Sequence, residues 1–181
     1  MNAESQAIDI LLLGSGGREH AIAKKLAASP RCGKLYIAPG NGGTSQEGEN
    51  ISLDENDPTA VAAFAKDHGC GMVVIGPEAP LVVGVADAVR EAGIPCFGPG
   101  AEGAQMEGSK LFSKQLMERA GVPTAAYGSF TDEQSALDYV NAQGAPLVVK
   151  ADGLAAGKGV IVATELEQAL DAVHECFSGA F

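Results

Sequence analysis

The chain has little of what marks secreted, membrane or nucleic-acid-binding proteins. Its 181 residues include four cysteines but no CxxC pair, and no apolar run approaches the ~18 residues of a membrane span. Residues 1–9 show no basic leader followed by an apolar core, which argues against a signal peptide. The 12 basic residues are outnumbered by 23 acidic ones, and this net charge of −11 disfavours nucleic acid as a partner. We expect a cytoplasmic protein with buried free thiols and no membrane association.

Glycine is the one residue type in clear excess. The apolar fraction of 46% and the charged fraction of 19% are those of an ordinary folded globule. The 24 glycines, however, are roughly twice the number that an average usage of about 7% would give. The positions of these glycines therefore carry most of the information about function.

The first hundred residues alternate between short apolar runs and amphipathic segments. The runs at 8–13, 34–37, 72–75 and 95–97 predict strands, and helical spacing follows at 17–28, 57–68 and 82–93. Such β-α alternation predicts an α/β fold with a doubly wound, mostly parallel, Rossmann-like sheet that is covered on both faces. Ligands of such sheets bind at the carboxyl ends of the strands.

The pattern changes in the second half of the chain. A helix is predicted over 109–120, followed by Gly121 and a hinge at Val122-Pro123. Strands are predicted at 127–130, 147–150 and 160–163, and helices at 132–143 and 166–177, with a glycine loop joining the last two strands as a hairpin. We therefore predict an N-terminal α/β domain over 1–100, a linker and helix over 101–124, and a small α+β lobe over 125–181.

The first glycine motif follows the first strand and opens the first helix. Gly14, Gly16 and Gly17 leave backbone N–H groups and a helix dipole where an anionic group can sit. A dinucleotide fingerprint requires a third glycine or alanine where Glu19 stands, so that interpretation loses ground. A tight turn with no ligand remains an alternative. At the ends of the next strands lie the loop 39–43 and Glu78, which suits ribose hydroxyls or an amine but equally suits a solvated loop.

The second glycine motif spans residues 150–160. It is not a P-loop, because three residues rather than four separate its glycines and Gly159 stands where Ser or Thr would bind magnesium. A glycine-rich hairpin with Lys150 on its first strand and Lys158 in its turn can instead cover a triphosphate. Lys150 can also be a solvated strand end, and spacing alone makes Lys110 only a cation at a helix start. The three histidines show no metal-ligand spacing, so no metal site is predicted.

Five segments together resemble the glycinamide ribonucleotide synthetase family, the phosphoribosylamine-glycine ligases of purine biosynthesis. The resemblance extends over essentially the whole chain, and its segments are 14–20, 38–43, 76–81, 108–110 and 148–160. It implies an ATP-grasp enzyme that joins glycine to 5-phosphoribosylamine, with ATP and Mg²⁺, through glycyl phosphate. Phosphorylation supplies the leaving group that a carboxylate lacks, while the protein positions the reactants and neutralises charge.

The resemblance also implies residue roles. On the phosphoribosylamine side it places Gly14, Gly16, Gly17, Arg18, Asn41, Gly42 and Glu78. On the ATP side it places Lys110, Lys150, Asp152, Gly153, Gly157, Lys158 and Gly159. It implies that family members continue past this point with the adenine-binding strand, the magnesium ligands and a further domain. We thus expect an incomplete ATP-grasp lobe that is inactive alone and can self-associate through an open sheet edge; no catalytic residue is assigned.

Two other classes of function remain. A dinucleotide-binding module would need the missing fingerprint glycine and an acidic residue at the end of the second strand, where the sequence has Ala38-Pro39-Gly40. A non-catalytic nucleotide-binding module would share every motif described above. Ligand titrations separate the first of these from a ligase, and an activity measurement separates the second.

Overall fold

The computed structural model describes residues 7–154 and 159–179 and divides the chain into two compact units, Met1–Gln105 and Met106–Phe181. Among the described helices, none has the length and apolar character that a membrane span requires. The four cysteines are free thiols, as expected, but only Cys70 is buried and the other three are half-buried.

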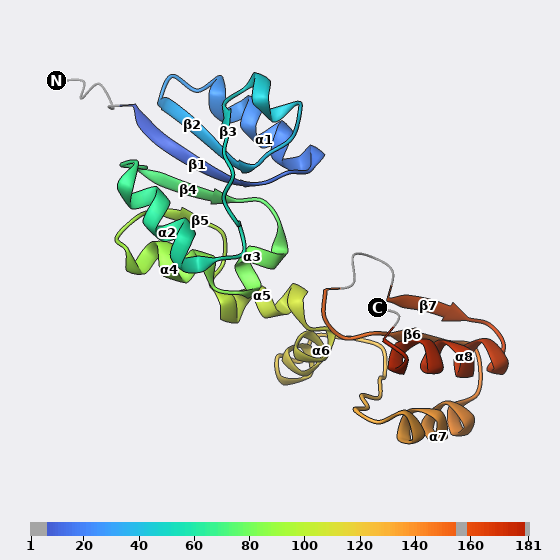
Figure 1. Ribbon diagram of the computed structural model, residues 1–181. Helices are drawn as coiled ribbons and strands as arrows, with labels where there is room; N and C mark the ends of the chain where they lie inside the picture. The colour runs from blue at the N-terminus through green and yellow to red at the C-terminus, as the bar shows by residue number, and fades with distance from the viewer. Residues whose placement is uncertain (1–6, 155–158, 180–181) are drawn as a thin grey trace. The chain divides into compact units, whose positions relative to one another are not determined.

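The first unit is built on a five-stranded parallel sheet with the strand order β3-β2-β1-β4-β5 (Figure 1). The strands are β1 (Ile8–Gly14), β2 (Cys32–Pro39), β3 (Glu49–Asn50), β4 (Met72–Ile75) and β5 (Cys96–Phe97). The helices are α1 (Gly17–Ala27), α2 (Pro58–Asp67), α3 (Glu78–Val82) and α4 (Val85–Glu91); α5 (Ala101–Gly108) begins in this unit and ends in the second. The predicted doubly wound parallel sheet is confirmed.

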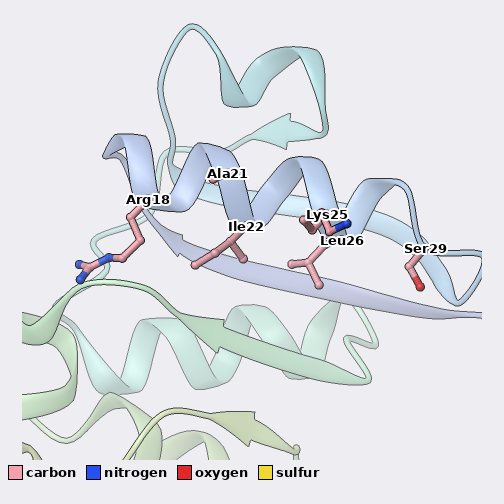
Figure 2. A pocket seen from close by; sticks show the side chains of 6 residues that line it. All are labelled: Arg18, Ala21, Ile22, Lys25, Leu26 and Ser29. Atoms are coloured by element: carbon pink, nitrogen blue, oxygen red, sulfur yellow. The ribbon is translucent and has the colours of Figure 1, made fainter.

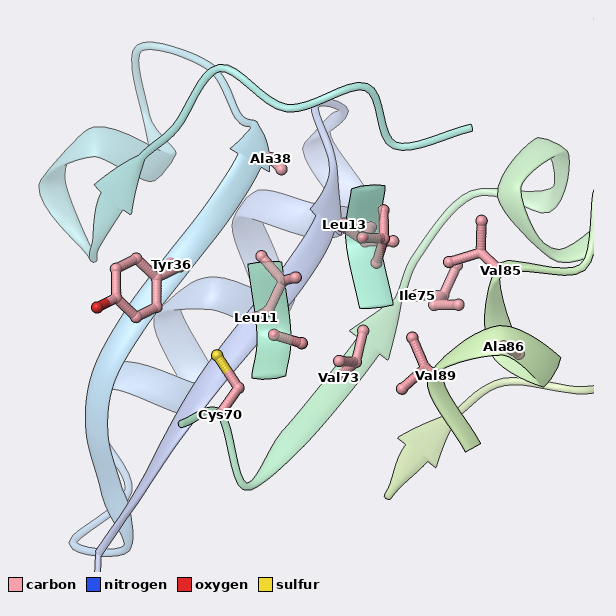
Figure 3. Packing of buried hydrophobic residues seen from close by; sticks show 12 residues of the cluster. Leu11, Leu13, Tyr36, Ala38, Cys70, Val73, Ile75, Val85, Ala86 and Val89 are labelled. Carbon is pink, nitrogen blue, oxygen red and sulfur yellow. The ribbon is translucent and has the colours of Figure 1, made fainter. Parts of the chain in front are cut away.

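Both faces of this sheet are covered, which explains the continuous apolar run of β1. Leu11 and Leu13 pack with Val73, Val85 and Val89 on the face of α2 and α4, as Figure 3 shows. Ile10 and Leu12 pack on the opposite face against α1. Burying successive residues on alternate faces is what a doubly covered parallel strand requires. The consequence is a rigid carboxyl edge, at which β1, β2 and β4 all end.

The helix predicted over 82–93 corresponds to α4, which begins later, at Val85. A separate short helix, α3, covers Glu78–Val82, where the sequence predicts a loop. Gly84 lies between them with φ +87°, a left-handed conformation that interrupts helical hydrogen bonding and that glycine adopts without strain. The short strand β3 and the helix α5 have no counterpart in the prediction.

The second unit contains α6 (Lys110–Arg119), α7 (Glu133–Gln143), β6 (Leu147–Lys150), β7 (Val160–Ala163) and α8 (Leu166–Phe177). β6 and β7 pair antiparallel, with Val148 opposite Val162 and Lys150 opposite Val160. The predicted hairpin is therefore confirmed. One face of the pair packs on α7 and α8, with a core of Ala136, Val140, Ala163, Ala169 and Val173.

The opposite face of this hairpin is apolar and exposed. Val148, Val160 and Val162 are 47%, 43% and 69% exposed. Alternate residues of a strand point to opposite faces, so Lys150 shares this face with the three valines.

The strand predicted at 127–130 is wrong. These residues belong to no strand, and no described strand pairs with them. Side-chain contacts with α6 hold the chain just before and at the start of this segment: Lys114 Nζ donates to Thr124 Oγ1 and the Ala125 carbonyl, and Tyr127 Oη donates to Glu118. Phe130 packs beside Tyr139 and against the core of the second unit without being part of a sheet.

Candidate functional site

Three loops meet the carboxyl edge of the first sheet. They are the turn from β1 to α1, the loop after β2 and the turn from β4 to α3. The loops are held by hydrogen bonds of Glu19, Arg18 and Asn41. Arg18, Asn41 and Glu78, which were predicted as separate contributors to one site, are linked through this network.

Glu19 is the buried centre of this edge. Its side chain is only 3% exposed, and Oε2 accepts the Gly16 N–H at 2.9 Å as the third residue of α1. A Cβ atom at Gly14 or at Gly76 would collide with this side chain, so both glycines provide the space that Glu19 occupies. Glu19 thus lies between the ends of β1 and β4, the crevice where a doubly wound sheet would receive a dinucleotide. The structure gives this physical reason for the poor dinucleotide fingerprint.

Arg18 joins two carboxylates from different loops. Its Nε donates to Glu19 Oε1 at 2.8 Å, and its Nη1 donates to Glu78 Oε1 at 3.0 Å. These hydrogen bonds, first to Glu78 and then to Glu19, raise the pKa of Arg18, so the guanidinium stays charged. The bond from Arg18 is in turn the main reason why the pKa of Glu78 lies below its ordinary value. Glu78 is therefore an ionised acceptor at neutral pH.

Asn41 ties the loop after β2 to the turn after β1. Its Nδ2 donates to the Ser15 carbonyl at 2.7 Å, while its Oδ1 accepts the N–H groups of Gly43 and Thr44 at 2.7 and 3.0 Å. All these side-chain contacts are internal, so Asn41 shapes the loop. Gly42 is the open position beside it, since a Cβ there would meet nothing within 4 Å.

The N-terminus of α1 has backbone N–H groups that an anion could use. Glu19 accepts the N–H of Gly16, whereas the N–H groups of Gly17 and Arg18 have no acceptor among the described residues. Gly17 is exposed, and a Cβ there would meet nothing within 4 Å. Free amides at a helix start with an arginine beside them suit a phosphate group.

An open groove runs along the flank of α1. It has a volume of about 610 Å³ and is lined by Arg18, Ala21, Ile22, Lys25, Leu26 and Ser29 (Figure 2). Of the predicted site residues it shares only Arg18, and Figure 2 shows Ile22 and Leu26 giving it an apolar wall. The groove follows the helix instead of the three loops, so we assign it no ligand.

In the second unit, Lys110 and Asp152 are brought together. Asp152 accepts from Ser109 Oγ at 3.0 Å and from the Lys110 N–H at 2.6 Å, and Lys110 Nζ donates to the Gly153 carbonyl at 2.8 Å. The Gly159 carbonyl accepts the Ala151 N–H at 2.8 Å and closes the stem of the glycine loop. Gly157 and Lys158 lie outside the described residues.

No metal centre is present in the described ranges 7–154 and 159–179, where no three His, Cys, Asp or Glu side chains gather closely enough to hold an ion. No reaction step is therefore assigned to a metal held by this part of the chain.

Three structural roles escaped the sequence analysis. Glu19 is predicted only as the residue that replaces a fingerprint glycine, although its position three residues after Gly16 lets its carboxylate accept the Gly16 N–H, which is one half of a capping box. Thr44 is fully buried, and its hydroxyl accepts the Asn41 N–H at 2.7 Å and lies 2.8 Å from Asn50 Oδ1. The contact between Ser109 and Asp152 spans 43 residues, and no local pattern indicates it.

Family models divide the chain almost where its two units meet. The phosphoribosylglycinamide synthetase N domain matches residues 8–107, and the ATP-grasp (A) domain of the same synthetase matches residues 108–181. The chain belongs to the phosphoribosylglycinamide synthetase family. This confirms the resemblance drawn from the motifs.

Relatives within the phosphoribosylglycinamide synthetase family support the match. The phosphoribosylamine–glycine ligases of Rhizobium meliloti and Agrobacterium fabrum are 55% and 57% identical over 172 residues, which is 95% of this chain and 41% of each relative. The crystal structure of the Thermotoga maritima ligase superposes with a TM-score of 0.71 at 30% identity, covering 91% of this chain and 38% of that one. A biotin carboxylase domain from Hydrogenobacter thermophilus shares the fold, with a TM-score of 0.71 at 18% identity. The chain spans about two fifths of the length of these relatives.

Proposed function

We propose that this chain forms the N-terminal part of a phosphoribosylamine–glycine ligase of purine biosynthesis. In this proposal the first unit binds 5-phosphoribosylamine and the second contributes to the ATP site. The observation that carries it is the Arg18 bridge between Glu19 and Glu78, which presents an ionised carboxylate beside a helix N-terminus. Family membership supports the assignment of the ligands.

The sugar phosphate suits the carboxyl edge of the first sheet. Its phosphate would accept hydrogen bonds from the free amides of Gly17 and Arg18, with Gly42 leaving room beside them. Its hydroxyl groups or its amine would donate to Glu78, whose pKa is lowered by Arg18. Asn41 and Gly16 would hold the loop that surrounds the ligand.

The exposed hairpin face suits a nucleotide. Val148, Val160 and Val162 form an apolar surface on which a base can lie, and Lys150 on the same face can neutralise phosphate charge. Lys110, Gly153 and Gly159 lie at the stem of the loop. We include Gly157 and Lys158 in this proposal from the sequence motif alone.

The reaction would proceed in two transfers. A glycine carboxylate oxygen attacks the γ-phosphorus of ATP and ADP leaves, which gives glycyl phosphate. The neutral amine of phosphoribosylamine then attacks the acyl carbon, the amine loses a proton and inorganic phosphate leaves, which gives glycinamide ribonucleotide. The residues of this chain would bind, orient and neutralise charge in these steps, while magnesium would help to neutralise the ATP phosphates through ligands outside the described residues.

Titration calorimetry with ribose 5-phosphate and with ATP tests the two sites separately. We expect Arg18→Ala to weaken ribose 5-phosphate binding at least ~10-fold, because a charged hydrogen-bonding group is lost. Arg31→Ala, at an exposed arginine after α1, is the control and should leave binding unchanged. Equal affinities of the two variants would contradict the sugar-phosphate assignment.

For ATP, the matched pair is Lys150→Ala and Arg119→Ala, the latter at the exposed end of α6. The first should weaken ATP binding and the second should not. We further expect no product from the 181-residue chain with all substrates present, because the relatives carry more than half of their length beyond the matched part. Measurable glycinamide ribonucleotide formation would contradict this expectation.

A further inference from the structure

The carboxylate of Asp152 caps a helix that begins 42 residues earlier in the chain. Its Oδ1 accepts the N–H groups of Lys110 at 2.6 Å and Leu111 at 3.3 Å, and its Oδ2 accepts from Ser109 Oγ at 3.0 Å. The Ser109 hydroxyl oxygen accepts the Phe112 N–H at 3.1 Å. The first three N–H groups of α6 therefore have hydrogen-bond acceptors. Asp152, just after β6, accepts two of them, and Ser109 accepts the third.

This cap brings a lysine side chain to the same place. Lys110 Nζ donates to the Gly153 carbonyl at 2.8 Å, one residue beyond Asp152. The backbone of Lys110 is held by the carboxylate and its ammonium by the next carbonyl, so both ends of this residue are fixed against the stem of the glycine loop. Lys150, the last residue of β6, is only two residues before Asp152.

Asp152 itself is poorly placed to bind phosphate. Both of its oxygens already accept hydrogen bonds, and a carboxylate repels a nearby phosphate by its charge. The family resemblance places Asp152 among the residues around ATP, whereas its contacts indicate a different role.

We propose that Asp152 is a positioning residue that fixes the start of α6 to the end of β6 and so holds the Lys110 ammonium beside the glycine stem. The part of this inference that concerns ATP rests on the proposed function. The hydrogen-bonded contact of Asp152 with the start of α6 (the tie) does not depend on the proposed function.

The electrostatics agree with this geometry. Partial burial raises the pKa of Asp152, but the bonds from Ser109 Oγ and from the backbone N–H groups of Leu111, Lys110 and Gly153 outweigh it. The net pKa lies below its ordinary value, so the carboxylate is ionised at neutral pH and the cap is charged.

The test compares two caps of the same unit in the 181-residue chain. Asp152→Ala removes the long-range cap, whereas Asp132→Ala removes a local one, in which the carboxylate accepts the Ser135 N–H of its own helix α7 at 2.9 Å. In amide hydrogen exchange, Asp152→Ala should accelerate Lys110 and Leu111 at least ~10-fold, and Asp132→Ala should not. The NMR resonance of Lys110 Nζ should shift toward that of a free lysine only in Asp152→Ala.

Asp152→Asn is a control that distinguishes loss of the cap from general unfolding of the unit. Its amide oxygen can still accept the Lys110 N–H without the negative charge, so we expect exchange rates between those of the wild type and Asp152→Ala. Unchanged Lys110 and Leu111 exchange in Asp152→Ala would overturn the tie. Faster exchange with an unchanged Lys110 Nζ resonance would reduce Asp152 to a simple helix cap and would also overturn the positioning role.

ATP titration forms a separate arm. If the wild-type chain binds ATP, Asp152→Ala should weaken binding about 10-fold while Asp132→Ala leaves it unchanged, and equal weakening by both would overturn the role in ATP binding. A wild-type chain that fails to bind ATP would contradict the ATP site of this chain in the proposed function. The exchange rates and the Nζ resonance would still decide the tie.

Discussion

A glycine-containing loop follows β1 in the first unit, and another follows β6 in the second. Each loop is next to a carboxylate that accepts hydrogen bonds from the start of a helix. In the first unit Glu19 caps its own helix from three residues away, is 3% exposed and also binds Arg18. In the second unit the exposed Asp152 caps a helix that begins 42 residues earlier. The neighbouring strands carry apolar residues that are exposed to solvent. The cap in the first unit is local and buried, whereas the cap in the second unit depends on tertiary structure.

This difference predicts that the largest loss of stability follows from Glu19→Ala. The substitution leaves the Gly16 amide and Arg18 without their buried acceptor and opens a cavity beside Gly14 and Gly76. We expect a loss of about 3 kcal/mol in the first unit, measured by hydrogen exchange of the β1 amides. Glu78→Ala, which removes the half-buried partner of Arg18, should cost less than about 1 kcal/mol. Equal costs would contradict the central role of Glu19.

The space provided by Gly76 gives the next largest effect. A Cβ at this position would strike the Glu19 side chain, so Gly76→Ala should destabilise the first unit by about 2 kcal/mol. Gly42→Ala, at a position with nothing within 4 Å, should be nearly neutral. In the background of Glu19→Ala, the cost of Gly76→Ala should largely disappear, and a double-mutant cycle by urea unfolding measures this coupling. Additive costs would show that the collision is relieved in another way.

Asp152→Ala should have a smaller effect on the stability of its unit, about 1 kcal/mol by hydrogen exchange of the β6 amides. The folded-state pKa of Asp152 is lowered, so its contribution is present at neutral pH and is lost as the pH falls through that pKa. The stabilities of the wild type and of Asp152→Ala should therefore become equal at acidic pH. A difference that persists at pH 2 would mean that the charge is not the cause.

Glu55→Gln should have the smallest effect, and it should be stabilising. Glu55 Oε2 is buried without a hydrogen-bond partner among the described residues, and burial, followed by Glu19 and Asp54, raises the pKa of Glu55. A raised folded pKa favours the protonated form, so the wild type loses stability as the pH rises through it. We expect Glu55→Gln to gain roughly 0.5 kcal/mol at pH 7 and nothing at pH 3 in thermal unfolding. A gain that is independent of pH would exclude this explanation.

Local patterns predicted most of the first unit and only part of the second. The apolar run of β1 and the Asp57-Pro58 helix start are local signals, and both elements formed where expected. The division into α3 and α4 at Gly84 was missed because an isolated glycine within a helical pattern does not reveal its φ angle. The strand expected at 127–130 failed because side-chain contacts from α6 took the place of strand pairing.

The same division holds for the candidate site. The glycines, Arg18 and Glu78 could be selected from strand ends and from the family resemblance. The interaction of Arg18 with both Glu19 and Glu78 joins residues 60 positions apart, which a single sequence does not reveal. The use of Asp152 by α6 is a long-range contact of the same kind.

The remote cap has a consequence for the order in which the protein acquires structure during synthesis. α6 leaves the ribosome before Asp152 does, and α6 has no buried side chain to stabilise it in the meantime. The first turn of α6 should therefore fray in a nascent chain and become ordered only when the hairpin of β6 and β7 emerges. Ordering of the helix that carries Lys110 would then depend on formation of the strand that carries Lys150.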